Sequence, residues 1–285
     1  SLGTDYNGGS TQIQTVNGGN PQLREETADT WTAGIVLQPS FLPRLTITAD
    51  FYSIKVADYI SSPGTTSIVR ACYGDAENGY TPYDASYCSL LPRDANSYTI
   101  TDAQNVLANT GGLKTRGIDF EARYSVPLAF GAFGTDQSTL SFRLSGTRLL
   151  NFDINPLASI PNLTVNCAGK FGLNCGDPYA KWRLAGRATW NTGPVSVSLA
   201  YRYLSPVRDD DDTTSYAVER IKPYHYFDLS TSFEVAKSFT WAVGVNNLFN
   251  RQPPILGTNQ EQANTYPSTY DPYGRTFFTN VSLKF

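Results

Sequence analysis

The sequence predicts an all-β protein, an antiparallel transmembrane β-barrel, and three observations support that fold class. Apolar and polar residues alternate with a period of two, as in strands whose two faces meet different surroundings. The connections between these segments are short and long in turn, as in membrane barrels. Of the 285 residues, 13% are aromatic and only 16% are charged, whereas soluble domains have about 25% charged residues.

The first four predicted strands span residues 29–38, 44–57, 113–126 and 138–150. Polar residues fill the positions between their apolar ones, so one face of each strand would be wet. In the second strand the apolar row changes parity after Phe51, which indicates a bulge or a strand end that projects beyond the apolar band. The apolar rows are Trp31, Ala33, Ile35 and Leu37; Leu45, Ile47, Ala49 and Phe51; Ile118, Phe120, Ala122, Tyr124 and Val126; and Leu140, Phe142 and Leu144.

The remaining five predicted strands span residues 180–191, 194–205, 224–235, 238–248 and 274–285, which makes nine in all. The same alternation runs through each of them. Several aromatic residues lie near the strand ends, where membrane barrels carry their aromatic girdles. The apolar rows are Trp182, Leu184, Gly186, Ala188 and Trp190; Val195, Val197, Leu199, Tyr201 and Tyr203; Phe227, Leu229, Thr231, Phe233 and Val235; Phe239, Trp241, Val243 and Val245; and Phe277, Thr279, Val281, Leu283 and Phe285.

The predicted connections fall into two classes. Residues 39–43, 127–137, 192–193 and 236–237 form short turns, whereas 58–112, 151–179, 206–223 and 249–273 form long loops. Membrane barrels have short periplasmic turns and long extracellular loops. The alternative is a soluble β-sandwich with an aromatic core, but the polar rows carry charged residues that a dry core would not accommodate.

Composition excludes several other classes. The net charge is −3 and the basic residues do not cluster, so nucleic acid is not an expected partner. The apolar stretches are far shorter than the roughly 20 residues of a membrane helix. The chain contains no Met, and residues 1–20 do not resemble a signal peptide, so we expect a processed chain or a fragment.

The chain contains three motifs, at Asn20–Glu26 with Gly34, Leu113–Glu121 and Gly244–Asn250, and a final strand that ends in Phe285. Together they resemble segments of the TonB-dependent receptors of the Gram-negative outer membrane. Asn20–Glu26 with Gly34 is similar to the family segment NPxLxPExxxxxxxG, except that Glu25 replaces the second Pro. Leu113–Glu121 resembles the strand entry xxTxGxExE, and Gly244–Asn250 resembles the segment GVxNLFD. The last strand alternates up to a terminal Phe285, like the insertion signal of outer-membrane proteins. The resemblance covers essentially the whole chain.

The resemblance implies a 22-stranded barrel that is filled by a plug domain. Residues 1–285 would supply its C-terminal nine or so strands, residues 1–28 would be the remnant of an extracellular loop, and the plug domain would be absent from this chain. The implied function is active import of a scarce solute, driven by the TonB-ExbB-ExbD complex through the plug. The implied partners are the plug, the remaining strands, outer-membrane lipid and lipopolysaccharide, and a small-molecule substrate. The alternative is a passive porin or a structural barrel protein.

The four cysteines fall in pairs within two predicted extracellular loops. Cys72 and Cys88 share the first loop, and Cys167 and Cys175 share the second. Because the implied compartment is oxidising, two local disulfides are expected. Free thiols or a metal site are the alternatives, although a four-thiolate site would need two loops to meet and lacks paired short spacing.

The charged residues on the polar rows would face the barrel lumen. Their signs are mixed, so most could pair across the wall. One role is to keep the lumen wet and dock the plug, and the other is to guide the substrate past a displaced plug. These residues are Asp119, Glu121, Arg123, Arg143, Arg183, Arg187, Arg202 and Asp228.

Substrate capture is assigned to the tyrosine-rich loops, because tyrosine stacks on sugar rings and also suits aromatic siderophores. The candidate contacts are Tyr73, Tyr80, Tyr266, Tyr270, Tyr273 and Arg275. The predicted loops contain no His and no Met that would suggest capture of heme or a soft metal. A carbohydrate or other organic nutrient is therefore slightly preferred, with a ferric siderophore as the next candidate.

An acidic run and a single histidine are the remaining candidate chemical sites. Asp209, Asp210, Asp211 and Asp212 form an acidic run that could bind Ca²⁺, but the residues lack the alternate spacing of a calcium loop, and a solvated loop tip is the simpler interpretation. The single histidine, His225, lies at a strand entry and is expected to be a rim residue rather than a catalytic base. The sequence therefore predicts neither an enzyme nor a bound cofactor or metal.

Overall fold

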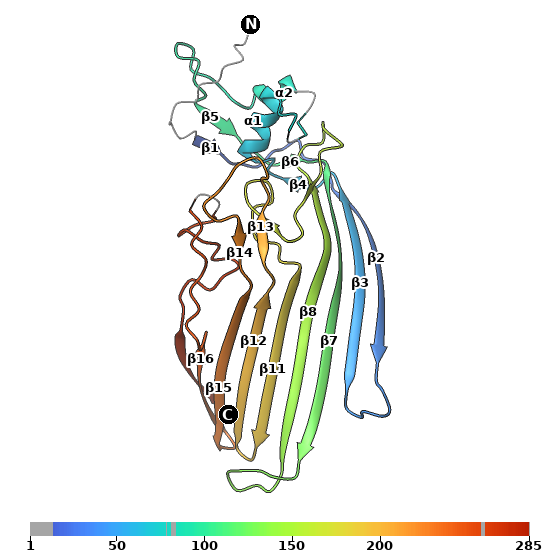
Figure 1. Ribbon diagram of the computed structural model, residues 1–285, viewed down its shortest axis with the longest axis vertical. Helices are drawn as coiled ribbons and strands as arrows, with labels where there is room; N and C mark the ends of the chain where they lie inside the picture. The colour runs from blue at the N-terminus through green and yellow to red at the C-terminus, as the bar shows by residue number, and fades with distance from the viewer. Residues whose placement is uncertain (1–13, 78, 81–83, 258–259, 285) are drawn as a thin grey trace.

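The computed structural model describes residues 14–77, 79–80, 84–257 and 260–284. Its main feature is one curved antiparallel sheet, with nine strands in chain order and a short tenth strand at its margin (Figure 1). The predicted fold class is confirmed: neighbouring strands along the chain are also neighbours in the sheet. In sheet order the strands are β17 (Thr276–Leu283), β16 (Phe239–Asn246), β15 (Tyr224–Ala236), β12 (Val195–Leu204), β11 (Trp182–Thr192), β8 (Ser138–Asn155), β7 (Gly112–Leu128), β3 (Thr46–Ala57) and β2 (Thr27–Leu37), and β9 (Val165–Asn166) pairs with β8.

The strand register places the apolar rows side by side on one face. Phe142, Ala188, Leu199 and Leu229 are successive cross-strand partners on β8, β11, β12 and β15. Three of these side chains are large and 37–43% exposed, since among the described residues no second layer packs against this face. Trp31 on β2 is 61% exposed. An apolar face without a protein partner is typical of a wall that meets lipid.

The change of parity in β3 has a definite cause. β3 pairs with both β2 and β7 without a register shift, so it contains no bulge. Beyond Phe51 the outer face instead becomes polar, with Ser53 and Lys55, and this end of the strand projects past the apolar band. The irregularity lies one strand away, where the β7–β8 register shifts between Arg116 and Gly117. β8 also runs to Asn155, five residues beyond its predicted end at 150.

Two glycines of the recognised motifs lie beneath aromatic rings on the neighbouring strand. A Cβ on Gly117 would lie 2.5 Å from Cζ of Tyr52, and one on Gly244 would lie 2.4 Å from Cζ of Phe278. Each ring belongs to the direct cross-strand partner of its glycine. The glycines are therefore required by cross-strand packing, because any side chain there would displace the ring.

The short turns lie at one end of the sheet and the long connections at the other (Figure 1). The long connections contain small elements that the alternation did not predict. No helix in the described residues is long and apolar enough to cross a membrane. Residues 1–13 of the predicted loop remnant and the terminal Phe285 lie outside the described residues. The small elements are β1 (Gln14–Val16), β4 (Ile60–Ser61), α1 (Thr65–Tyr73), α2 (Ala85–Cys88), β5 (Asp102–Gln104), β6 (Ala108–Asn109), β10 (Lys170–Phe171), β13 (Val207–Asp209) and β14 (Arg220–Ile221).

The long connections have hydrophobic cores of their own. The largest combines Phe171, Val207, Ile221, Leu256 and the start of β15, so it joins three successive loops. In the first loop, α1 forms because its apolar residues recur at helical spacing and reach the core of that loop. Both predicted disulfides are present within the loops, Cys72–Cys88 and Cys167–Cys175. The loops form a packed cap on one end of the sheet.

Candidate functional site

All eight charged residues predicted to face the lumen lie on the same face of the sheet, opposite the apolar rows. The register aligns Asp119 with Thr147 and Arg183, and Glu121 with Ser145, Ala185 and Arg202. A third row contains Arg123, Arg143, Arg187, Ala200 and Asp228. This arrangement follows from the period of two, which places every second side chain on the same side of a strand.

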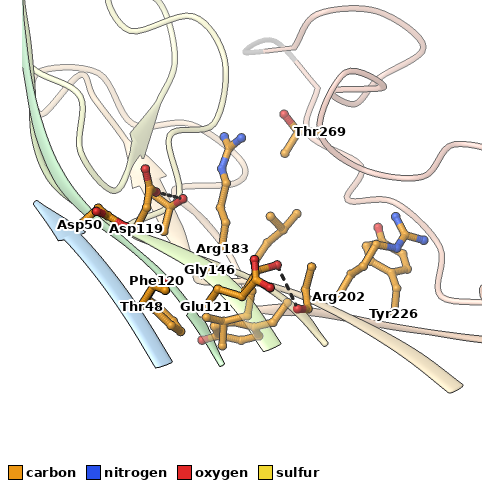
Figure 2. A pocket seen from close by; sticks show the side chains of 16 residues that line it. Thr48, Asp50, Asp119, Phe120, Glu121, Gly146, Arg183, Arg202, Tyr226 and Thr269 are labelled. Carbon is orange, nitrogen blue, oxygen red and sulfur yellow. Dashed lines mark hydrogen bonds between the residues drawn. The ribbon is translucent and has the colours of Figure 1, made fainter. Parts of the chain in front are cut away.

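A cavity of about 550 Å³ lies on this inner face, beneath the loop cap. Asp50 and Asp119 lie on one side of it, Arg202 and Tyr226 lie on the other, and Arg183 extends between them (Figure 2). Thr269 of the β16–β17 connection lines the cavity opposite the strands. The site is therefore built by the sheet and by one of the long loops together.

The cavity contains charges of both signs. Asp50 and Asp119 are direct cross-strand partners, and Asp119 accepts a hydrogen bond of 2.5 Å from the Thr147 hydroxyl. Arg183 donates to the Pro178 carbonyl oxygen at 2.9 Å. Such a wall can bind a polar solute through several hydrogen bonds and ion pairs.

Arg202 is fixed at the far side of the cavity by two contacts. Its guanidinium is 3.3 Å from the Asp228 carboxylate and 4.8 Å from the centre of the Tyr226 ring. The Tyr226 hydroxyl in turn accepts a hydrogen bond from the backbone N–H of Asp271, which ties the β16–β17 connection to the wall. Asp228 also accepts from the backbone N–H of Asn247 at 2.8 Å, so the recognised Gly244–Asn250 motif anchors this side of the site.

The acidic run is a buried junction between loops, and the solvated-tip interpretation is wrong for three of its four residues. Asp209, Asp210 and Asp211 are 3–8% exposed. Arg70 of α1 reaches Asp211 at 3.9 Å and Asp75 at 3.0 Å, and it donates to the Asn174 side-chain oxygen at 3.1 Å. Three loops therefore meet at one guanidinium.

The two central carboxylates of this junction have pKa values shifted in opposite directions. Burial raises the pKa of Asp210, although its carboxylate accepts backbone N–H groups of Asn174 and Cys175. Burial acts the same way on Asp211, but hydrogen bonds from Thr213 and Tyr216 outweigh it and lower the pKa of Asp211 to about 2. These carboxylates are engaged by protein donors. In the described part of the chain, no group of three or more His, Cys, Asp or Glu side chains is placed to hold a metal ion.

The predicted substrate contacts divide into buried and exposed residues. Tyr80, Tyr266 and Tyr270 are 1–4% exposed and belong to the loop cores, so they present almost no surface to a ligand. Desolvation accordingly raises the pKa of all three phenols. The other three candidates, Tyr73, Tyr273 and Arg275, are exposed.

His225 lies on the outer face, away from the cavity. Its Nδ1 is 2.9 Å from the Tyr201 hydroxyl and its ring is stacked on that of Tyr201. Sequence reasoning missed Asp50, Arg70 and Asn174. Asp50 could have been found, because it lies between Ala49 and Phe51 on the polar side of its strand, whereas no local pattern marks the other two.

An antiparallel sheet with an apolar outer face, a charged inner face and long connections at one end has the organisation of an outer-membrane β-barrel wall. The chain belongs to the family described as TonB dependent receptor-like, beta-barrel, whose model matches residues 1–248. Members of this family are transport receptors rather than enzymes. A comparison with curated proteins gave no match.

Solved structures share the fold at low sequence identity. A variant of the ferric enterobactin receptor from Pseudomonas aeruginosa, solved with enterobactin, is 18% identical with a TM-score of 0.57, and the match covers 94% of this chain and 33% of that one. The siderophore receptor PirA from Acinetobacter baumannii is 14% identical with a TM-score of 0.51, and the match again covers 94% and 33%. The chain thus spans about a third of the length of these receptors.

Proposed function

We propose that this chain is the C-terminal barrel wall of an outer-membrane receptor that imports a scarce solute with energy delivered through TonB. The observation that carries the proposal is the charged cavity on the inner face, lined by the sheet and by Thr269 of one long loop, in a chain of this family. In the complete receptor the exposed loop residues Tyr73, Tyr273 and Arg275 would meet the solute first. The cavity would receive it next.

The charges of the cavity favour a polar organic nutrient, such as a carbohydrate, over an anionic ferric siderophore. Of the charged residues that line it, Glu121 is paired with Arg123 and Arg202 with Asp228, which leaves the carboxylates of Asp50 and Asp119 against the guanidinium of Arg183. Carboxylates are good acceptors for sugar hydroxyls, and the excess of one negative charge would oppose an anionic complex. The ferric siderophore remains the second candidate, because two structural neighbours are receptors for such ligands.

Uptake by cells that produce the full-length receptor tests this proposal. We expect labelled solute to accumulate only in a strain with intact TonB, and Asp119→Asn to reduce uptake at least fivefold. Asp29→Asn is the matched control, because Asp29 aligns with Lys55 on the outer face. Uptake that persists without TonB would favour a passive porin and would refute the proposal. Growth on candidate carbon sources and under iron limitation would distinguish the two substrate classes.

A further inference from the structure

The β7–β8 connection runs beneath the end of β11, at the short-turn end of the sheet (Figure 1). The outer-face row at this end begins with Ser138 and Thr192, which are direct cross-strand partners. The Thr192 hydroxyl accepts a hydrogen bond of 2.7 Å from the backbone N–H of Ala132 and donates to the carbonyl oxygen of that residue at 3.1 Å. The Ser138 hydroxyl donates to the Phe130 carbonyl oxygen at 2.6 Å. Residues 130–135 therefore lie on the outer side of two strand ends, and we call this segment the foot.

The same row is apolar on the strands that the foot does not reach. Beyond Thr192 it continues across β12 and β15 to Trp241 on β16 and Val281 on β17. Trp241 and Val281 are 43% and 54% exposed on the membrane-facing side. Thr192 and Ser138, beneath the foot, are only 1% and 7% exposed. At β8 and β11 the foot thus takes the place that lipid takes along the rest of this row.

Two phenylalanines of the foot are exposed. Phe130 and Phe133 are 60% and 62% exposed. Phe133 has a φ of 56°, in the left-handed region that bulky side chains rarely adopt and that glycine or asparagine would adopt more easily. Asp136 is the only charged residue in the connection, residues 129–137. An almost uncharged segment that keeps a phenyl ring on a strained backbone, and leaves it exposed, is suited to apolar surroundings rather than to bulk water.

The occupant that fits the foot is phospholipid. The foot lies on the face whose apolar rows meet lipid, so its surroundings are continuous with that interface. Backbone N–H and C=O groups in lipid need partners within the protein, because acyl chains offer none. The hydroxyls of Thr192 and Ser138 supply such partners to the foot, in a row that is otherwise apolar. The Ser138 hydroxyl also accepts from the indole N–H of Trp190 at 3.0 Å, and tryptophan is typical of the membrane interface.

We propose that the foot is a lipid-binding site: residues 130–135 lie in the periplasmic leaflet of the bilayer, with the rings of Phe130 and Phe133 among the phospholipid acyl chains. An aromatic girdle places rings that stand on the strands at the interface, whereas here a whole turn is folded onto the membrane-facing surface. The foot would hold this end of the wall at a fixed depth, while the two-residue turn of β15 and β16 reaches the periplasm. The inference concerns how the wall sits in the membrane and does not depend on the solute.

Collisions of a spin label with oxygen and with a nickel chelate test the proposal, in the full-length receptor in vesicles of phosphatidylethanolamine and phosphatidylglycerol. p-Acetylphenylalanine in place of Phe133 keeps the aromatic ring and carries the nitroxide. Oxygen concentrates among acyl chains and the chelate stays in water, so the oxygen-to-nickel ratio of collision rates should be about tenfold higher at 133 than at Lys237. Lys237, in the exposed β15–β16 turn, is the matched control. Equal ratios, or low rates with both reagents because protein covers the ring, would overturn the proposal.

A phospholipid with a diazirine on its acyl chain provides the second measurement. It should label residues 129–137, and Phe130→Asn with Phe133→Asn should reduce that labelling about tenfold while keeping the backbone, since asparagine tolerates positive φ. Tyr98→Asn is the matched control, because Tyr98 is also exposed at a φ of 58° but lies in the loop cap. Equal labelling in both variants would contradict the proposal. A nitroxide at Leu229 separates the two levels of inference: lipid contact there with water at 133 refutes only the foot, whereas water at both refutes the membrane wall and the receptor with it.

Discussion

Replacement of Arg70 by Met should loosen the loop cap while leaving the sheet intact. The Arg70 side chain is only 16% exposed, and its partners Asp75 and Asp211 are 22% and 1% exposed at their side chains. It also donates to Asn174, which lies 104 residues away in the chain. Met has a similar length and supplies no charge, so the substitution removes the polar contacts but keeps much of the volume.

The magnitude follows from these three contacts. Loss of the partly buried ion pair with Asp75 and of the hydrogen bond to Asn174 should cost about 2 kcal/mol together. Asp211 is left without its cation in a buried position, which adds about 1 kcal/mol, since hydrogen bonds from Thr213 still satisfy its carboxylate. A loss of about 3 kcal/mol corresponds to roughly a 100-fold increase in local opening.

Native-state hydrogen exchange measures this change directly. The amides of Gly172 and Gly176 hydrogen-bond to each other's carbonyl oxygens beside Asn174, so they report opening of this loop. We expect their protection to fall about 100-fold in Arg70→Met while amides of β11 and β12 are unchanged. Arg24→Met is the matched control, because the Arg24–Asp58 ion pair is 72% and 43% exposed and should contribute less than about 1 kcal/mol. A change of less than fivefold in Arg70→Met, or an equal change in both variants, would refute the reasoning.

Three further outcomes are expected. Opening of the Cys72–Cys88 disulfide by Cys72→Ser with Cys88→Ser should destabilise the first loop by about 3 kcal/mol, measured as lost exchange protection in α1, with no change at the second loop. Because the pKa of Asp211 is lowered in the folded cap, its ionised carboxylate stabilises the cap by about 2 kcal/mol at pH values above the unfolded pKa of about 4. This contribution should disappear as the pH falls towards 2. Asp211→Asn should abolish that part of the acid dependence, which is measured as proteolysis of the loop. Leu229→Lys on the outer face should lower the free energy of unfolding of the barrel by about 2–4 kcal/mol, measured by urea unfolding of the protein in lipid vesicles. Ser230→Lys on the inner face should lower it by less than about 1 kcal/mol, and equal effects would contradict the assigned faces.

Much of the wall could be predicted from the sequence because its pattern is local. Alternation over strands such as β7 and β8 fixes which residues share a face, and the inner row of Asp119, Glu121 and Arg123 followed directly from it. The two disulfides could also be predicted, because both cysteines of each pair lie in the same loop. The loop residues were different: Tyr80 and Tyr266 look like exposed ligand contacts in the sequence, but they are buried.

The sequence alone determined the strands, their faces, the sorting of short turns and long connections, and the family, because a wall between lipid and water imposes a period of two on every strand it contains. Only the tertiary structure decided which loops pack together, that Asp209–Asp211 form a buried junction with Arg70, that Tyr52 covers Gly117, and that Arg123, Arg143 and Arg187 stand in one row. These features depend on register and on contacts between segments distant in the chain. Neither the register of the strands nor a contact between distant segments produces a periodic pattern in the sequence.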